Sequence, residues 1–122
     1  MTTAAHVPTH VHDWIGGELF KHVPSNIIVV DREFKVVTAN PNFVEVFGEA
    51  EGKYCYEVYK KRSSPCEHCM TKKTFQDGEV RISDADGIDK RGRPAHYVVH
   101  IVPVRDQKGD ITHCIEMSYD VT

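Results

Sequence analysis

The sequence predicts an α+β fold with five antiparallel strands and several short helices. The main observation is the last third of the chain, where residues 79–88, 94–104 and 111–121 have the pattern of three consecutive strands. Polar connections with one glycine each join these strands, as hairpin loops of this length require. Residues 26–31 and 35–39, rich in β-branched side chains, supply a first strand pair, and short helical segments separate the two groups.

The composition is that of an ordinary globular domain. The chain has 122 residues, enough for one core, with 40% apolar and 27% charged side chains. Its net charge is −3 and no basic patch mixes with aromatic residues, so we expect no nucleic-acid partner. The longest apolar run, residues 27–30, is too short to insert into a membrane. Four cysteines without a visible secretion signal predict reduced thiols and a cytoplasmic location.

The N-terminal segment divides into an arm and a helix. Residues 1–12 have the polar, histidine-containing composition of a flexible arm. Asp13 can cap a helix that runs to Val23, with Ile15 and Leu19 on one apolar stripe. Two adjacent glycines weaken this helix, so we expect it to need a surface on which to dock.

The middle of the chain carries the helices. Asn40 and Pro41 mark a helix start, because asparagine caps a helix and proline suits its first position. Two more helices are predicted at 53–61 and 66–76. The run IIVVDREFKVVTANPNFVEVFG, together with the final Asp-Val-Thr, resembles the PAS domain family, and the resemblance covers residues 19–122.

This resemblance implies a PAS sensory domain over residues 13–122, with short helices and a small-molecule pocket on one face of the sheet. It also implies a homodimer that relays a signal to a C-terminal effector, most often a histidine kinase, which this chain does not contain. No nucleophile elbow, phosphate loop, His-Glu-x-x-His or paired-carboxylate arrangement occurs, so we expect the domain itself to have no enzymatic activity.

Both faces of the predicted sheet carry apolar side chains along the last two strands, so both need a cover. By resemblance, one set lines the ligand pocket: Tyr97, Val99, Ile101, Cys114, Glu116 and Ser118. The other face and the N-terminal helix would form the dimer interface, through Trp14, Ile15, Leu19, Ile115, Met117 and Tyr119.

Glu116 is unusual on the pocket side, because a buried carboxylate needs a partner or a raised pKa. One interpretation is that it recognises a polar ligand. The other is that it reaches solvent at a sheet edge or pairs with a lysine, and the sequence leaves both open.

Three cysteines, Cys55, Cys66 and Cys69, lie within fifteen residues. They pack between helices as reduced thiols, or bind zinc or an iron–sulfur cluster, or form a redox-switching disulfide. A metal site would need a fourth ligand, for which Cys114 or His68 is available. If the thiols hold a metal or react, the alternative function is a stand-alone metal-binding or thiol redox protein.

Two cofactors of related domains are not expected. The flavin-binding light-oxygen-voltage pattern Gly-x-Asn-Cys-Arg-Phe-Leu-Gln is matched only at Gly52 and Cys55, and Ser118 stands where a flavin-contacting glutamine belongs. Haem-binding members use a histidine on the helix that here begins near Cys66, and His68 lies too early in it.

Overall fold

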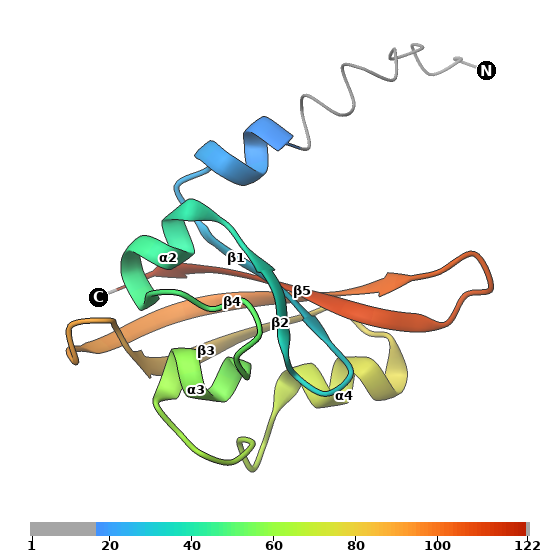
Figure 1. The fold of residues 1–122 in the computed structure, drawn as a ribbon. Coiled ribbons are helices and arrows are strands. Elements are labelled where there is room, and N and C mark those ends of the chain that lie inside the picture. Colours follow the sequence, from blue (N-terminus) through green and yellow to red (C-terminus); the bar gives the residue numbers. More distant parts are fainter. Residues whose placement is uncertain (1–16, 122) are drawn as a thin grey trace.

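The structure, a computed structural model, describes residues 17–121 and has the five-stranded antiparallel sheet at its centre (Figure 1). The spatial order of the strands is β2-β1-β5-β4-β3, so the first strand pairs with the last. Their bounds are β1 Asn26–Asp31, β2 Val36–Ala39, β3 Arg81–Ile88, β4 Pro94–Arg105 and β5 Ile111–Asp120. The predicted α+β fold class is confirmed.

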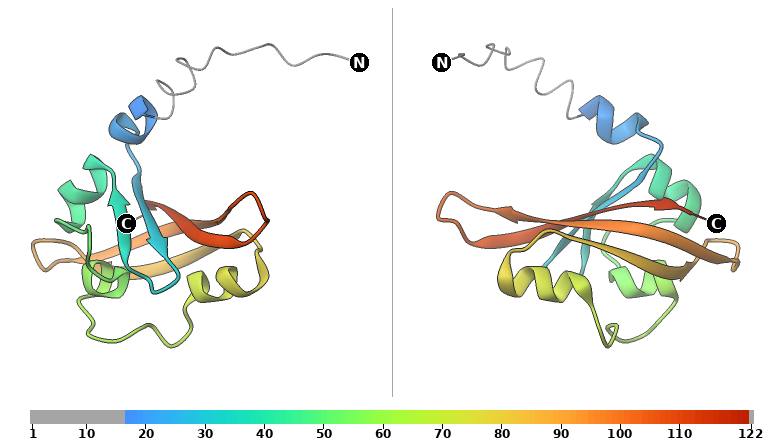
Figure 2. Two further views of the ribbon diagram at one scale, coloured as in Figure 1. Left: turned by 45° about the vertical axis from the view of Figure 1, so that its right-hand side comes forward. Right: turned by 180° about the vertical axis from the view of Figure 1, so that it is seen from behind.

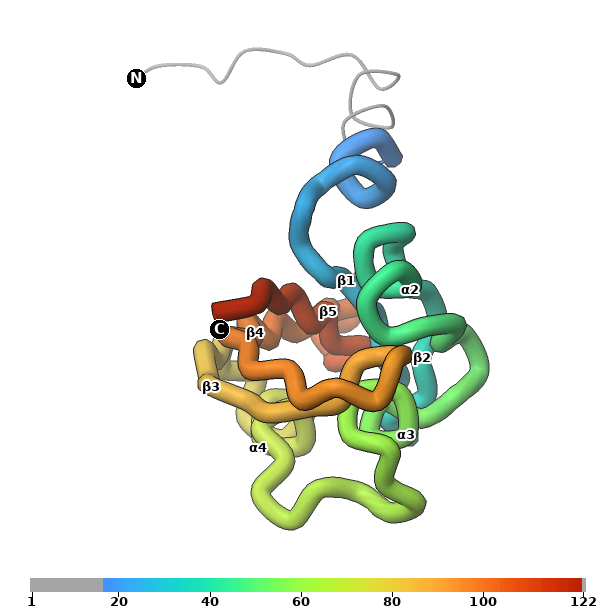
Figure 3. The backbone as a smooth tube through the Cα atoms, turned by 90° about the vertical axis from the view of Figure 1, so that its left-hand side faces the viewer, coloured from blue at the N-terminus to red at the C-terminus, as the bar shows by residue number. Residues whose placement is uncertain are grey.

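Three short helices, α2 Pro41–Phe47, α3 Cys55–Lys60 and α4 Met70–Asp77, lie on one side of this sheet (Figure 2). α2 packs beside β1, α3 packs against β3, and α4 packs against β3, β4 and β5. Viewed from the side, the loop between α3 and α4 hangs away from the sheet (Figure 3). α3 and α4 therefore both lie over the inner face of the sheet.

The start of α2 shows how local signals build this arrangement. Asn40 is fully buried, and its Oδ1 accepts hydrogen bonds from the backbone N–H groups of Phe43 and Ile27, both at 3.0 Å. Its Nδ2 donates to the backbone oxygen of Ser25 at 2.9 Å. One side chain thus caps the helix and fixes it to the start of β1, because it satisfies backbone groups of both.

The helix that was predicted over 66–76 begins only at Met70. Cys69 has an extended backbone and caps α4, since its Sγ accepts a hydrogen bond from the N–H of Lys72 at 3.4 Å. Cys66 therefore lies on the loop before the helix, whereas a helix over 66–76 would have placed Cys66 and Cys69 one turn apart, so that predicted start is wrong.

The helix predicted over 53–61 is also shorter. Tyr54 has an extended backbone and forms an isolated antiparallel β-bridge with Lys35. The N–H of Cys55 donates a hydrogen bond to the backbone oxygen of Phe34 at 2.9 Å. These contacts hold the chain extended until Cys55. The helix ends at Lys60 and is followed by Lys61, whose φ of 54° is left-handed.

The predicted N-terminal helix is present over 17–22 in the described part of the chain, but it does not cover the sheet. It lies beyond the end of β1, and Leu19 is 59% exposed (Figure 2). The predicted arm, residues 1–12, and the two interface candidates Trp14 and Ile15 of the predicted helix lie outside the described residues. Among the residues that are described, no helix has the length and apolar character needed to cross a membrane.

Candidate ligand pocket

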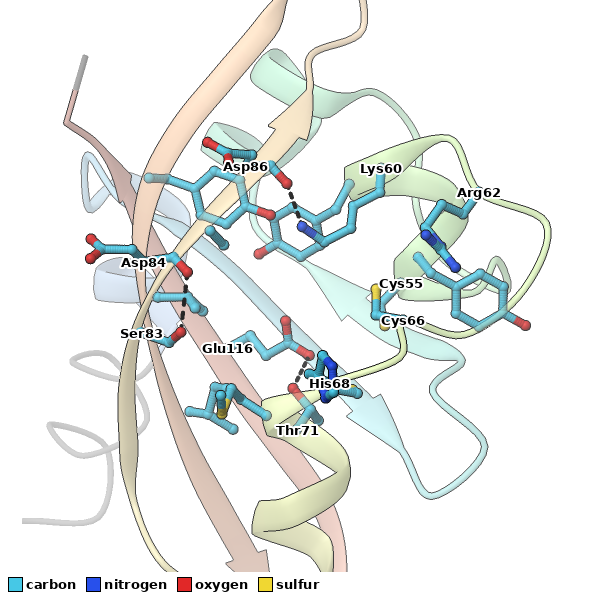
Figure 4. A pocket seen from close by; sticks show the side chains of 18 of the residues that line it. Cys55, Lys60, Arg62, Cys66, His68, Thr71, Ser83, Asp84, Asp86 and Glu116 are labelled. Carbon is cyan, nitrogen blue, oxygen red and sulfur yellow. Dashed lines mark hydrogen bonds between the residues drawn. The ribbon is translucent and has the colours of Figure 1, made fainter.

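A cavity of about 490 Å³ opens between α3, α4 and the edge strand β3 (Figure 4). Its floor is the inner face of the sheet and its walls are the two helices. The residues that line its inner part are Tyr59, Thr71, Ala85, Tyr97, Val99, Ile101 and Glu116. A pocket of this size and mixed lining can hold a small organic molecule.

Gly87 on β3 permits the close approach of α3 that forms one wall. A Cβ atom at this position would lie 2.5 Å from the backbone oxygen of Tyr59 and 3.0 Å from Cε1 of Tyr97. No larger residue fits without moving α3, because atoms at such distances overlap. An isolated glycine within a strand is the sequence signal that indicates such a close backbone approach.

Aromatic side chains form the end of the pocket next to α2. The rings of Tyr59 and Tyr97 stack with centroids 5.2 Å apart, and Tyr59 also meets Phe43 and Phe47 edge-on at 5.1 and 4.8 Å. The Tyr59 hydroxyl lies 3.5 Å from Oγ of Ser118. Burial raises the pKa of Tyr59 well above its ordinary value, so this hydroxyl stays protonated.

Glu116 is the buried carboxylate of this pocket. It projects from β5 and is only 6% exposed, and its Oε2 accepts a hydrogen bond from the Thr71 hydroxyl at 3.1 Å. No described residue donates a hydrogen bond to Oε1. Burial raises the pKa of Glu116 to about 7, against smaller opposing effects of Thr71 and Lys60. The carboxyl group therefore changes protonation near neutral pH, with one oxygen available to a ligand.

Basic side chains lie at the mouth. Lys60 donates a hydrogen bond to the backbone oxygen of Asp86 on β3, and its ammonium lies 5.9 Å from the centre of the Tyr97 ring. Arg62 and His68, both exposed, also line the opening. Lys60 does not form an ion pair with Glu116, so the lysine-paired interpretation of this glutamate is not supported.

All three clustered cysteines line the same pocket, although they come from different segments. Cys55 is the first residue of α3, Cys66 lies on the connecting loop and Cys69 caps α4. Each is a free thiol. Burial raises the pKa of Cys55 and, to a smaller degree, that of Cys69. Within residues 17–121, no group of three or more Cys, His, Asp or Glu side chains is arranged to hold a metal ion, so the geometry does not support zinc or an iron–sulfur cluster.

The pocket residues proposed from the alternation along β4 and β5 divide into two groups. Tyr97, Val99, Ile101 and Glu116 line the cavity. The other two are turned to the same side of the sheet without lining it: Cys114 is fully buried in the core, and Ser118 lines a smaller neighbouring hollow. The partners supplied by the helices, Tyr59, Lys60 and Thr71, were missed, since only the fold brings them to the sheet.

The opposite face of the sheet carries the other predicted set. Ile115 and Met117 are half-buried and Tyr119 is 45% exposed, in the alternation expected of β5. The ring of His100 on β4 lies 6.0 Å from that of Tyr119. In this single chain the face stays open to a partner, and its role as a dimer interface remains a prediction.

The comparisons with known proteins agree with this architecture. The family model of the PAS fold matches residues 20–122. No curated protein matches the chain.

Among solved structures, an RNA-binding light-oxygen-voltage receptor has a TM-score of 0.81 at 24% identity, covering 100% of this chain and 36% of the receptor. This chain therefore spans about a third of the receptor's length. A PAS domain from Colwellia psychrerythraea has a TM-score of 0.79 at 13% identity, covering 91% of this chain and 98% of that one.

A structure of VqmA bound to DPO has a TM-score of 0.67 at 21% identity, covering 88% of this chain and 57% of VqmA. These likenesses show the fold. Together with the family model, which spans the sheet, the three helices and the pocket, they show that the chain belongs to the PAS family of signal-sensing domains.

Proposed function

We propose that this chain is the sensory module of a signalling protein and binds a small ligand in the pocket between α3, α4 and the sheet. The observation that carries the proposal is Glu116, a buried carboxylate on the pocket floor with one oxygen that no described residue satisfies. This oxygen is open to the cavity rather than sealed in the core, so a ligand with a hydrogen-bond donor can pair with it there. The solved structure of VqmA bound to DPO, a neighbour of this fold, is in line with a ligand-binding role.

The chemistry of the pocket favours a particular ligand. A carboxylate accepts hydrogen bonds, so the ligand needs an N–H or O–H donor at the end that meets Glu116. Tyr97, Val99 and Ile101 offer an apolar and aromatic surface to the rest of it. The ligand is therefore a small ring or short-chain compound with a nitrogen donor, preferably a cationic one, since the charge strengthens the bond.

The signal would leave through β5. This strand carries Glu116 on the inner face and ends at Asp120, near the end of the chain. We propose a C-terminal effector, most often a histidine kinase in such proteins, and a homodimer that places two effectors side by side.

The cytoplasmic location stays a prediction from the unpaired cysteines, and no catalytic role is proposed for the domain. The nucleic-acid partner named for the RNA-binding receptor belongs to that protein.

Benzamidine and benzoate make a matched pair of probes, because they share a ring and differ in whether they donate to or repel a carboxylate. At about pH 8, where Glu116 is ionised, we expect benzamidine to shift the amide resonances of Thr71, Tyr97 and Glu116 in heteronuclear NMR spectra, and benzoate not to. Glu116→Gln should weaken benzamidine binding about tenfold, since a charge-assisted hydrogen bond contributes about 1.5–3 kcal/mol. Equal binding of both probes, or equal affinity in the variant, would contradict the proposal.

A further inference from the structure

The thiols at the pocket mouth have no part in the function proposed above. Cys55, Cys66 and Cys69 line one cavity from a helix, a loop and a helix cap. Cys66 and Cys69 both help to raise the pKa of Cys55, and Cys66 helps to raise that of Cys69. Thiols that come together around one opening can be oxidised to a disulfide.

Cys55 and Cys66 are the pair best placed to react. Both line the same pocket on the side formed by α3, Cys55 at the start of that helix and Cys66 on the loop that follows it (Figure 4). Cys69 is engaged as the cap of α4, where its Sγ accepts the hydrogen bond from Lys72, and bonding it elsewhere would remove that cap. Cys114 is fully buried within the core, apart from this cavity.

The loop that carries Cys66 is able to adjust. Its residues from Lys61 to Pro65 are exposed, and the hydrogen bonds of Arg62 to the backbone oxygens of Ser64 and Pro65 stay within the loop. No described hydrogen bond joins residues 63–68 to the sheet. Such a segment moves at little cost, so Cys66 can reach the bonding distance that a disulfide demands.

We propose that Cys55 and Cys66 form an intramolecular disulfide by exchange with a low-molecular-weight disulfide, of which glutathione disulfide is the model. Cys66, on the exposed loop, loses its proton to water, and its thiolate attacks one sulfur of glutathione disulfide. That S–S bond breaks, and the expelled glutathione thiolate takes up a proton. Cys55 then loses its proton, and its sulfur attacks Sγ of Cys66 and expels the second glutathione, which is protonated in turn. Two protein thiols are oxidised and one glutathione disulfide is reduced to two glutathiones.

The disulfide would fasten the loop to α3 across one side of the pocket mouth. Entry of a ligand toward Glu116 then depends on the oxidation state of the pair. The bond itself requires only the geometry of the thiols, whereas its control of ligand entry rests on the proposed function. The two can therefore fail separately in one set of measurements.

The test incubates the whole chain with glutathione disulfide, blocks remaining thiols with an alkylating reagent and maps the tryptic peptides by mass spectrometry. Trypsin separates Cys55, in peptide 54–60, from Cys66 and Cys69, both in peptide 63–72. We expect these two peptides to be joined in the wild-type chain, with the loss of two hydrogens from the intact mass. Cys69→Ser should keep the joined pair, whereas Cys66→Ser and Cys55→Ser should lose it.

Four outcomes would overturn the proposal: a joined pair that survives in Cys66→Ser, a Cys66–Cys69 bond within peptide 63–72, a lasting glutathione adduct, or a bond between two chains. A second measurement follows benzamidine binding to the oxidised chain. We expect its affinity to be at least tenfold lower than that of the reduced chain. An oxidised chain that binds as the reduced chain does would keep the disulfide and refute its control of ligand entry. A reduced chain that does not bind benzamidine would instead count against the proposed function.

Discussion

The two faces of the sheet differ in how far their side chains are buried. On β1, Ile28 is fully buried and points to the helices, whereas its neighbour Ile27 is half-buried on the opposite face. On β5 the buried residue is the charged one: Glu116 is buried on the inner face, whereas the apolar Ile115 is half-buried on the outer face. Apolar character alone therefore does not identify the inner face. What distinguishes it is contact with α2, α3 and α4.

The polar groups of the inner face show what this contact requires. Nδ2 of Asn26 donates to Oγ of Ser118 at 3.3 Å, and Nδ2 of Asn42 donates to Oδ1 of Asn26 at 2.8 Å. The hydroxyl of Tyr59 lies next to the same serine. These groups satisfy one another, as burial demands. Glu116 departs from the pattern because one of its oxygens faces the cavity, which is why we assign it to a ligand rather than to the core.

The largest effect should come from the same substitution on neighbouring residues of β1. Ile28→Ala removes a side chain with no exposed surface, so we expect the free energy of unfolding to fall by about 3 kcal/mol. Ile27→Ala removes one from the half-buried face and should cost about 1 kcal/mol. Urea denaturation of both variants measures the difference. Equal losses would mean that the outer face is packed as tightly as the inner one.

The second effect concerns the charge on the inner face. The folded chain raises the pKa of Glu116 from 4.5 to about 7, so between these values the native state binds more protons than the unfolded state. The stability from this group is present below about pH 4.5 and is lost as pH rises through 7. The full shift corresponds to about 3 kcal/mol as an upper value.

Glu116→Gln removes this titration while its amide oxygen still accepts from Thr71. The wild-type chain should therefore lose stability relative to the variant between about pH 5 and pH 8, in urea denaturation at each pH. Parallel curves for the two proteins would show that the carboxyl group titrates normally. Other groups facing Glu116 from the packed elements are shared by both proteins: Cys55, Tyr59, Lys60, Cys69, Thr71 and Tyr97.

The third effect tests how closely α3 lies against the sheet. Gly87→Ala places a methyl group 2.5 Å from the backbone oxygen of Tyr59, and we expect a loss of about 2 kcal/mol as α3 moves outward. Gly92→Ala is the control, because nothing lies within 4 Å of its Cβ position and only its φ of 81° opposes alanine. It should cost about 1 kcal/mol. If Gly92→Ala costs more, the close contact at Gly87 is not the larger of the two constraints.

Most of the sheet could be predicted from sequence, because alternation and turn residues act locally. The bounds of β1 were found as they are, since a β-branched run lies between Asn26 and Asp31. The start of α4 was misplaced because the Cys66–Cys69 spacing suits a helix equally well, and only the extended backbone at Cys69 decides otherwise. The partners of Glu116 could not be predicted, because Thr71 lies 45 residues away in sequence.

The smallest effect on the single chain, and the most direct test of the outer face, is Ile115→Glu. Because Ile115 is half-buried on the face that no described helix covers, the charge should change the stability of the isolated chain by less than about 1 kcal/mol. A carboxylate at the centre of an apolar interface would stay unpaired, so the variant should sediment as a monomer where the wild-type chain sediments as a dimer.

Val80→Glu adds the same charge at a position that is 60% exposed and precedes β3, outside the predicted interface, and it should remain dimeric. A monomeric wild-type chain would remove the dimer prediction. If Ile115→Glu and Val80→Glu both dissociate the dimer, then net charge, rather than the face around Ile115, governs the association. Dissociation by Ile115→Glu alone would show that the outer face is completed by a second copy, as the inner face is completed by the helices.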